Sequence, residues 1–339
     1  MDVIIRADGG SEIGYGHLFR SAALAEELQR NGETVTVATT TPQPARTVFP
    51  ESVTISQLPS RSDPSPFIDW LDTAATDVVF TDCYPVDTSY QQAVRQRVPL
   101  AVLQDDARHA VCADLLVNGN LYAADLDYTY VGQQPKACLG PDYVILRREV
   151  RARLQKDPAW RPQPERALIT MGGSDTAGLT PTAVRAFDGF DLRVDAVVGP
   201  GCPAELEQEV RKAAATSSTK VRVSRNPETL VTLMAEADFA VSTASTTTYE
   251  LLALGTPILS IPVANNQEAV ASSLRRRDIA TVLQRTAGEK AFRNAIKELI
   301  QQTELRRTRQ RRGRELVDGN GVIRVRDALR SITETRADQ

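Results

Sequence analysis

Short apolar runs of strand length alternate along the chain with stretches of helical spacing. In the first half these runs are DVII, TVTVAT, VTISQL, DVVFTD, LAVLQDD and DLLVNGN. After a break the alternation resumes with RALITMGG, LRVDAVVG, KVRVSR, DFAVST, PILSIPV and IATVLQ. Strands that alternate with helices are typical of parallel sheets covered by helices. The pattern therefore predicts an α/β fold of two doubly wound, Rossmann-like parallel-sheet domains in succession.

Proline and charge interrupt this pattern around RARLQKDPAWRPQPE, where neither a continuous helix nor a central strand can persist. We therefore expect a linker over 151–164, between a first domain at 1–150 and a second domain at 165–318. The last stretch, 319–339, has helical spacing and is expected to pack as a helix across the domain joint. Ligands of open α/β sheets bind at the carboxyl ends of the strands, so two such edges facing each other would form a cleft.

Composition and charge narrow the choice of partners. At 339 residues the chain suits two domains of roughly 150 residues each. Charged residues make up 24% of the chain and the formal net charge is −3, which argues against disorder and against global attraction to nucleic acid. We expect a small-molecule partner and no nucleic acid. The sequence leaves the oligomeric state open, a monomer included.

Targeting signals and metal-binding patterns are not visible. MDVIIRAD lacks the basic and apolar regions of a signal peptide, and no apolar run approaches the ~20 residues needed to cross a bilayer. We therefore expect no membrane span and a cytoplasmic location. The cysteines form no C-x-x-C pair and lie near no histidine cluster, which disfavours a zinc site and a disulfide framework. Four reduced thiols are expected: Cys83, Cys112, Cys138 and Cys202.

One of the two histidines follows a glycine-rich loop between a strand and a helix. VIIRAD reads as the strand, GGSEIGYG as the loop, and HLFRSAALAEELQRNG as the helix. Free N–H groups and the dipole at such a helix start attract phosphate, and glycine permits close approach. The dipole also disfavours imidazolium, so His17 is a candidate base, and a histidine that only bonds a carbonyl is the alternative. Asp8, Gly14 and Gly16 are candidate substrate-binding residues here.

Two further segments place small and polar residues after strands. In ALITMGGSDTAG (167–178) a strand is expected to run into GGSD and then a helix, which suits a phosphate or nucleotide edge. In DFAVSTASTTTYELLALGTPILSIPVANNQ (238–267) the hydroxyls of Ser245, Thr246 and Thr247 can cap the next helix or donate to phosphate oxygens. Glu250 can accept both hydroxyls of a ribose, and complementation of the helix dipole is its alternative role.

These segments together resemble a known family. GYGHLFRSAALAEEL, GPDYVILRREV, MGGSD, TTYELLALGTPILSIP with the NQ after it, and VDGNGVIRVRDAL resemble the nucleotide-sugar hydrolases of pseudaminic acid biosynthesis. Those enzymes cleave UDP from a 2,4-diacetamido-2,4,6-trideoxy sugar. They adopt the two-domain GT-B fold shared with the transferase that adds N-acetylglucosamine to the peptidoglycan lipid precursor. The resemblance spans nearly the whole chain and implies a GT-B fold, a UDP-sugar substrate and no cofactor.

The resemblance also implies roles for individual residues. His17 would activate water, and Asn266 would hydrogen-bond at the reacting sugar. Tyr84, in TDCYPVD, would lie near the sugar, and Glu250 would hold the ribose. The nucleotide and pyrophosphate would be lined by Gly173, Ser174, Thr246 and Thr247, with Ser245 and Gln267 as further substrate-binding residues. Ala244-Ser245 stands where many members carry Gly-Gly, so side chains here fill space left open there.

Two carboxylate pairs and an arginine cluster have ordinary explanations. Asp105 and Asp106 close LAVLQDD, and because consecutive strand residues point to opposite faces, one of them is expected to cap a turn. Asp125 and Asp127 form DLD with no histidine or further carboxylate nearby, so no metal is expected. A solvated helix face beside Glu304 and Glu315, rather than a nucleic-acid site, is expected for the arginines at 306, 307, 309, 311, 312 and 314.

The leading hypothesis is a hydrolase that releases UDP from a UDP-activated diacetamido-trideoxyhexose, with water activated by His17. A glycosyltransferase of the same fold is the first alternative, since there His17 would deprotonate an acceptor hydroxyl. A noncatalytic nucleotide-sugar sensor and an epimerase acting at C2 of the sugar are further alternatives. An epimerase would normally need bases beyond the single histidine that the motifs supply.

Overall fold

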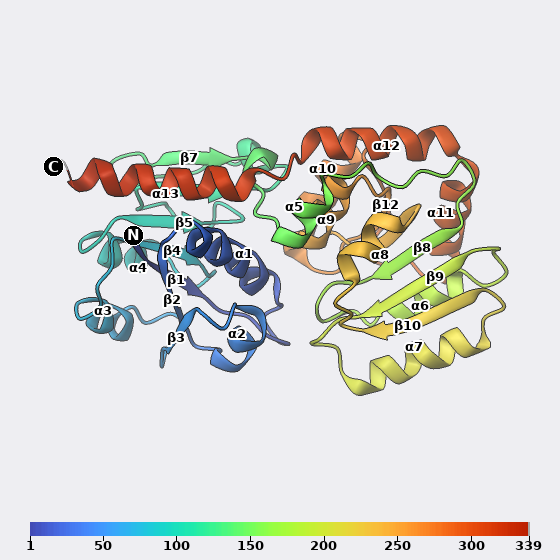
Figure 1. The fold of residues 1–339 in the computed structure, drawn as a ribbon, viewed down its shortest axis with the longest axis horizontal. Helices are drawn as coiled ribbons and strands as arrows, with labels where there is room; N and C mark the ends of the chain where they lie inside the picture. The colour runs from blue at the N-terminus through green and yellow to red at the C-terminus, as the bar shows by residue number, and fades with distance from the viewer. Residues whose placement is uncertain (338–339) are drawn as a thin grey trace. The chain divides into compact units, whose positions relative to one another are not determined.

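The computed structural model describes residues 1–337, which form two compact units (Figure 1). The first unit comprises residues 1–148 and the chain from residue 319 onward, and the second comprises residues 149–318. The final helix therefore belongs to the first unit. The expected linker is helical at its start, because α5 (Arg148–Arg153) runs into it. Both units are α/β, as the alternation of apolar runs predicts.

The first unit contains a parallel sheet of seven strands in the order β3-β2-β1-β4-β5-β6-β7. These strands are β1 (Asp2–Ala7), β2 (Thr34–Thr39), β3 (Thr54–Gln57), β4 (Val78–Asp82), β5 (Leu100–Leu103), β6 (Leu115–Asn118) and β7 (Lys136–Leu139). The helical elements are α1 (Gly16–Arg30), α2 (Pro42–Val48), α3 (Ser65–Leu71), α4 (Thr88–Arg95), η1 (Ala123–Asp125), η2 (Pro141–Tyr143) and α13 (Gly321–Ala337).

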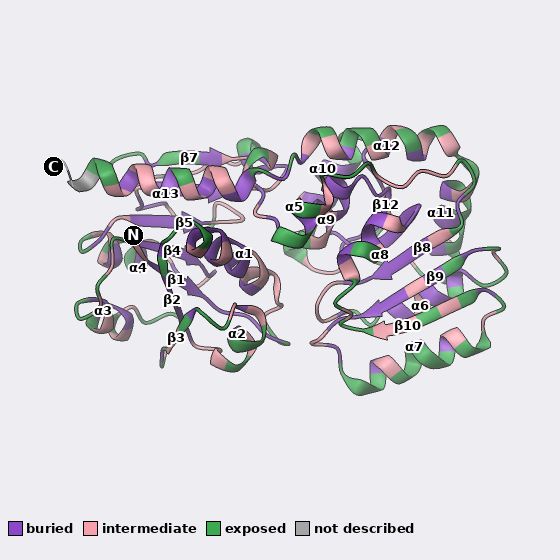
Figure 2. Cartoon of the chain, viewed as in Figure 1, coloured by how far each residue is buried: buried purple, intermediate pink, exposed green. Residues whose placement is uncertain are grey.

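Alternate residues of these strands bury on opposite faces of the sheet. In β1, Val3 and Ile5 join a core cluster with α1 and α13, whereas Ile4 joins a second cluster with α3 and α4. Strands of a parallel sheet are covered on both faces, which is why they read as continuous apolar runs. Figure 2 shows this burial along most strands, with exposure on the outer faces of the helices.

The second unit contains a parallel sheet of six strands in the order β10-β9-β8-β11-β12-β13. These are β8 (Arg166–Thr170), β9 (Arg193–Val198), β10 (Lys220–Arg225), β11 (Phe239–Thr243), β12 (Ile258–Ile261) and β13 (Ala280–Val282). The helical elements are α6 (Thr180–Ala186), α7 (Ala204–Thr216), α8 (Leu230–Glu236), α9 (Thr246–Leu254), η3 (Asn265–Gln267), α10 (Glu268–Arg276), α11 (Glu289–Gln301) and α12 (Thr303–Leu316).

Each sheet reverses its strand order once, and this reversal positions a candidate site. In the first sheet β1 lies between β2 and β4, and in the second sheet β8 lies between β9 and β11. Loops that leave two neighbouring strands toward opposite sides open a crevice at their carboxyl ends, where ligands of such folds bind. We therefore expect a ligand site at the loops after β1 and β4 in the first unit, and at the loops after β8 and β11 in the second.

Two further observations concern the cysteines and the helices. All four cysteines are free and buried, as the sequence predicts. Within residues 1–337, no helix combines the length and the hydropathy needed to span a membrane.

Candidate functional site

The loop after β1 closes on itself and delivers His17 to the start of α1. Gly10 and Gly14 exchange backbone hydrogen bonds of 3.1 and 2.8 Å, and Gly14 has φ +90°, which suits glycine. Helix α1 begins at Gly16, and no side chain caps its amino end. His17 is therefore the second residue of the helix, in the first turn as the sequence predicts.

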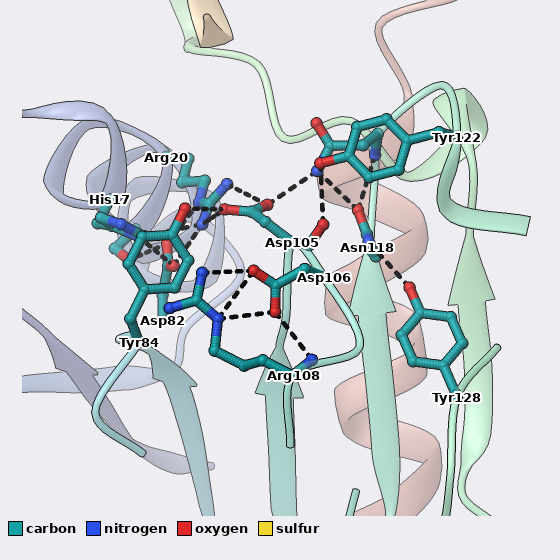
Figure 3. Close-up of polar contacts among 12 residues, drawn as sticks. His17, Arg20, Asp82, Tyr84, Asp105, Asp106, Arg108, Asn118, Tyr122 and Tyr128 are labelled. Atoms are coloured by element: carbon teal, nitrogen blue, oxygen red, sulfur yellow. Dashed lines mark hydrogen bonds and ion pairs between the residues drawn. The ribbon is translucent and has the colours of Figure 1, made fainter. Parts of the chain in front are cut away.

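His17 and Asp82 form a close pair across the strand-order reversal (Figure 3). Asp82 is the last residue of β4, opposite Ala7 of β1, and its side chain is fully buried. Its Oδ1 lies 2.6 Å from Nδ1 of His17, whose side chain is 11% exposed. The other ring nitrogen, Nε2, makes no hydrogen bond to any described residue.

The partners of Nδ1 determine the tautomer of His17. Arg20 also approaches Nδ1, at 3.0 Å, but a guanidinium only donates and an ionised carboxylate only accepts. Nδ1 cannot satisfy both, and the shorter contact of 2.6 Å is to Asp82. We infer that Nδ1 carries the proton and donates it to Asp82. Nε2 is then the lone-pair nitrogen, which is the arrangement that a histidine base requires.

Arg20 joins two carboxylates that lie on neighbouring strands. Its Nε and one Nη each lie 2.6 Å from Asp82 oxygens, and its two Nη atoms lie 2.9 and 2.8 Å from the oxygens of Asp105. Burial favours the neutral acid, but the charge and hydrogen bonds of Arg20, together with the hydrogen bond from His17, outweigh it and hold the pKa of Asp82 well below its usual range. The pKa of Asp105 is lowered for the same reason, with Arg20 as the main cause.

An aromatic ring and a second ion pair border this cluster. The ring of Tyr84 meets the ring of His17 edge to face, with centroids 4.8 Å apart. The guanidinium of Arg108 lies 4.4 Å from the Tyr84 centroid and pairs with Asp106, whose Oδ1 also accepts the backbone N–H of Arg108. Asp106 thus caps the turn, as expected for one member of the Asp105-Asp106 pair, while Asp105 faces Arg20.

The network continues along the carboxyl edge of the sheet to β6 (Figure 3). Asn120 donates to Oδ1 of Asp105 at 2.8 Å and to Oδ1 of Asn118, also at 2.8 Å. Asn118 is fully buried and donates to the hydroxyl of Tyr128 at 2.9 Å. The hydroxyl of Tyr122 donates to the backbone carbonyl of Asp105 at 2.9 Å. Five polar side chains from the ends of β5 and β6 and the chain that follows them thus form one network, which reaches Arg20 through Asp105.

Asp8, a predicted substrate-binding residue, is buried and accepts hydrogen bonds from other residues of the protein. Its carboxylate is 1% exposed and accepts hydrogen bonds from Arg6, Arg61 and Thr40, among others. The Sγ of Cys83 also approaches it, at 3.3 Å. Burial raises the pKa of the Cys83 thiol to about 12, so this thiol stays protonated. Among described residues Asp8 has no contact with His17.

In the second unit, Gly173 and Ser174 follow β8 in a tightly packed turn. Gly172 adopts φ +80°, and the carbonyl of Gly173 accepts the N–H of Gly201 at 2.8 Å. The expected helix does not follow directly, because α6 begins at Thr180. Asp175 caps that helix by accepting the N–H groups of residues 179 and 180 at 3.0 and 2.9 Å. The amino end of α6 is therefore filled by a carboxylate and is not available to a phosphate.

The amino end of α9 has no side-chain cap, whereas that of α6 is capped by Asp175. Ser245 is its N-cap residue but makes no side-chain capping bond, and its Oγ instead accepts from Thr243 at 3.1 Å. Thr246 and Thr247 are the first two helical residues, and Glu250 lies one turn further on. A Cβ placed on Gly172 would lie 3.9 Å from Oγ of Ser245, so the turns after β8 and β11 lie together. Uncapped N–H groups beside a glycine turn suit an anion.

The NNQ segment forms η3, between β12 and α10. Oε1 of Gln267 accepts the N–H of Val263 at 2.9 Å and so closes the turn. Oδ1 of Asn265 accepts from Arg285 at 2.7 Å. Asn266 is exposed at this turn. The predicted site residues lie in both units. The first unit holds His17, Tyr84, Gly14, Gly16 and Asp8, and the second unit holds the others.

Sequence reasoning missed Asp82 and Arg20 as partners of His17. Both carry a signal in hindsight: Asp82 ends a buried strand, and Arg20 lies three residues after His17 on one helix face. Recognising them needs the pairing of β1 with β4, which only the strand order supplies. Within residues 1–337, no three His, Cys, Asp or Glu side chains are arranged to hold a metal ion.

Comparison with known proteins identifies relatives in glycan biosynthesis. No protein-family model matches the chain. A spore coat polysaccharide biosynthesis protein of Bacillus subtilis is 24% identical over 345 residues, covering 98% of this chain and 99% of that protein. A UDP-2,4-diacetamido-2,4,6-trideoxy-beta-L-altropyranose hydrolase of Campylobacter jejuni is 23% identical over 289 residues, covering 82% and 97%. A Methanocaldococcus jannaschii protein is 24% identical, and the match covers 76% of this chain but only 55% of that protein.

Solved structures define the fold class. MurG of Acinetobacter baumannii superposes with a TM-score of 0.69 at 16% identity, covering 98% of this chain and 100% of that one. The calicheamicin glycosyltransferase CalG4 gives a TM-score of 0.68 at 15% identity, with 98% of each chain covered. Identities this low show the fold alone. The chain has the GT-B fold, with two Rossmann-like domains, and is similar to proteins of glycan biosynthesis.

Proposed function

We propose that this protein is a hydrolase that releases UDP from a UDP-activated diacetamido-trideoxyhexose. The observation that carries the proposal is the 2.6 Å contact between Nδ1 of His17 and Asp82, which leaves Nε2 as a base. The similarity to the Campylobacter jejuni hydrolase supports this choice of substrate. The cytoplasmic location expected from the sequence is part of the same proposal.

The proposed reaction is a displacement at the anomeric carbon by water. Nε2 of His17 takes a proton from water as the water oxygen attacks that carbon. The bond from the anomeric carbon to the pyrophosphate oxygen breaks, and its electron pair leaves with UDP. Asp82 stabilises the imidazolium that forms, as the carboxylate of a catalytic triad does. We assign Tyr84 and Asn266 to the reacting sugar.

UDP is assigned to the second unit. The turn at Gly173 and Ser174 and the uncapped start of α9 together offer backbone N–H groups and hydroxyls for phosphate oxygens. Ser245, Thr246 and Thr247 supply those hydroxyls, and Glu250 is one turn away for the ribose. The positive end of the α9 dipole would stabilise the charge that develops on the departing pyrophosphate.

The test is incubation of the purified protein with candidate UDP-diacetamido-trideoxyhexoses and no acceptor. Proton NMR should show the free reducing sugar and UDP appearing at a catalytic rate. Replacing the base in His17→Gln should lower kcat by about 10²–10⁴-fold and leave UDP affinity nearly unchanged. Asp82→Asn should give a loss of similar size, because an amide can favour the wrong tautomer. Near-normal turnover by the His17 variant would show that the assignment is wrong.

A glycosyltransferase is the second candidate, because the structural neighbours of the chain are glycosyltransferases. In that reaction Nε2 would take its proton from an acceptor hydroxyl instead of water. The same incubation separates the two candidates. A transferase would release free sugar only slowly until an acceptor is added.

A further inference from the structure

Arg20 and Asp105 lie behind the pair of His17 and Asp82. Arg20 grips both carboxylates with two contacts each, all between 2.6 and 2.9 Å. Asp105 makes no hydrogen bond to the imidazole. Its own oxygens accept from Arg20 and Asn120, and the Tyr84 hydroxyl lies at 3.4 Å. Any influence of Asp105 on His17 therefore passes through Arg20 or through space.

The charges of this cluster do not balance while His17 is neutral. Two carboxylates, that of Asp82 fully buried and that of Asp105 15% exposed, share one guanidinium, which leaves one negative charge uncompensated. Protonation of Nε2 would cancel that charge. The positive charge that develops on the ring as it removes a proton would therefore be compensated within the cluster, in partly buried surroundings where charges interact strongly.

We propose that Arg20 and Asp105 are positioning residues that set the proton affinity of His17. Arg20 holds Asp82 against Nδ1, and its positive charge offsets part of the negative charge around the ring. Asp105 holds Arg20 in place and adds a second negative charge to the cluster. The two residues therefore act on the charge around His17 in opposite directions. The mechanistic part of this inference rests on the proposed function, whereas the effect on protonation does not.

The groups that face His17 come from three elements of the first unit. Helix α1 contributes Arg20, β4 contributes Asp82 and the loop after it Tyr84, and the loop after β5 contributes Asp105. Arg108 and Asp106 lie beyond the Tyr84 ring and neutralise each other as an ion pair. The uncompensated charge is therefore a property of Arg20, Asp82 and Asp105.

Two substitutions should move the titration of His17 in opposite directions. Asp105→Asn keeps the shape and removes a negative charge, so the midpoint at which the ring protonates should fall by roughly one pH unit. Arg20→Gln removes the positive charge, so the midpoint should rise by roughly the same amount. If Arg20 and Asp105 had a purely structural role, both variants would lose stability or activity, and the His17 midpoint would not shift in opposite directions.

The measurement is an NMR titration of the imidazole carbons and protons. The chain has only His17 and His109, so a His109→Gln variant assigns the signals. Asp72→Asn is the matched control, because it removes the same charge from an exposed pair with Arg97, and it should leave the His17 midpoint in place. Shifts of the His17 midpoint in the same direction in the Asp105 and Arg20 variants, or shifts no larger than that of the control, would overturn the inference.

A conservative variant separates charge from geometry and guards against misfolding of Arg20→Gln. Arg20→Lys keeps the charge but cannot grip two carboxylates at once. The His17 midpoint should stay close to that of the wild type, while kcat falls roughly ten- to a hundredfold. The acidic limb of kcat/KM against pH should follow the NMR midpoints in Asp105→Asn. If the His17 midpoint shifts in opposite directions in Asp105→Asn and Arg20→Gln but the protein turns over no UDP-sugar, the proposed function is wrong. The inference about the protonation of His17 then still holds.

Discussion

Asp8 and Asp82 lie at the carboxyl ends of neighbouring strands, yet their surroundings differ. Asp82 points to a histidine whose other nitrogen is open, whereas Asp8 is enclosed by Arg6, Arg61 and backbone donors. For both carboxylates burial opposes ionisation, and nearby arginine charge and hydrogen bonds reverse that effect and lower the pKa. The residue type alone therefore does not distinguish a group that acts on the base from one that holds strands together.

Replacement of Asp8 tests its place in the protein. Asp8→Asn leaves Arg6 buried without its charge partner, so the free energy of unfolding should fall by about 3–5 kcal/mol. UDP affinity should change little. Because the folded-state pKa of Asp8 is lowered, its stabilisation is present above about pH 4 and is lost as the pH falls, so Asp8→Asn should weaken the acid dependence of stability.

Urea unfolding between pH 3 and 7 measures both effects, and Asp72→Asn serves as the exposed control. If Asp8→Asn kept wild-type stability but bound the UDP-sugar much more weakly, Asp8 would be a substrate-binding residue and not a structural one.

At the scale of elements, apolar patterning predicted most of the sheet. Every strand except β7 overlaps a predicted apolar run. β7 is a short edge strand in which Cys138 alone is buried, so it has no apolar run to detect. The helix expected directly after GGSD begins at Thr180 instead, because Asp175 adopts φ +39° and ends the turn as a cap.

The arginine-rich helix α12 shows a limit of charge patterns. The sequence predicts a solvated face, and Arg307, Arg311 and Arg312 are exposed. Arg306 and Arg309 are buried, which corrects that expectation. Arg306 donates to the backbone carbonyls of Leu299 and Pro162 at 2.5 and 2.6 Å. Those acceptors belong to the end of α11 and to a distant segment, so no local pattern reveals them.

The sequence predicted parts of the candidate site only where the signal is local. His17 follows a glycine loop at a helix start, so its position could be read from the chain. Its partners Asp82 and Arg20 become evident only when β4 is placed beside β1. In the second unit, the sequence could not show that Asp175 caps the start of α6. Nor could it show that the start of α9 has no side-chain cap.

The packing between two loops of the second unit gives an element-scale prediction. A Cβ on Gly199 would lie 2.4 Å from the carbonyl oxygens of both Gly172 and Gly173, which no side-chain motion can relieve. Gly199→Ala should therefore displace the turn after β8 and weaken UDP binding at least about tenfold, measured by calorimetry. Gly288→Ala is the control, because a Cβ there meets nothing within 4 Å. Unchanged UDP affinity in Gly199→Ala would remove this turn from the nucleotide site.

At the scale of the whole molecule, the two ends of the chain build one unit together. Val322, Val325 and Leu329 of α13 are buried in the core that α1 shares with the first sheet. Arg326 pairs with Glu27 at 2.6 Å, and Arg330 pairs with Glu33. The second unit, by contrast, is one uninterrupted segment with its own core. The cluster around His17 therefore lies in a unit built from residues more than three hundred positions apart, whereas the second unit comes from one segment.

This difference predicts how fragments behave. Residues 149–318 expressed alone should melt cooperatively and bind UDP. Residues 1–148 alone should fail to fold stably, because they lose α13, whose fully buried apolar side chains contribute about 1.5–3 kcal/mol each.

A short linker should rescue the first fragment. A Cβ on Gly321 would lie 2.2 Å from the carbonyl oxygen of Val144, so the chain near 148 and the chain near 319 run close together. Joining 1–148 to 319–339 should restore cooperative melting by circular dichroism. It should also bring back the His17 titration of the intact protein, because the described partners of the His17 ring, Arg20, Asp82 and Tyr84, lie in this unit. Stable folding of 1–148 without α13 would show that the final helix only covers a core that is already complete.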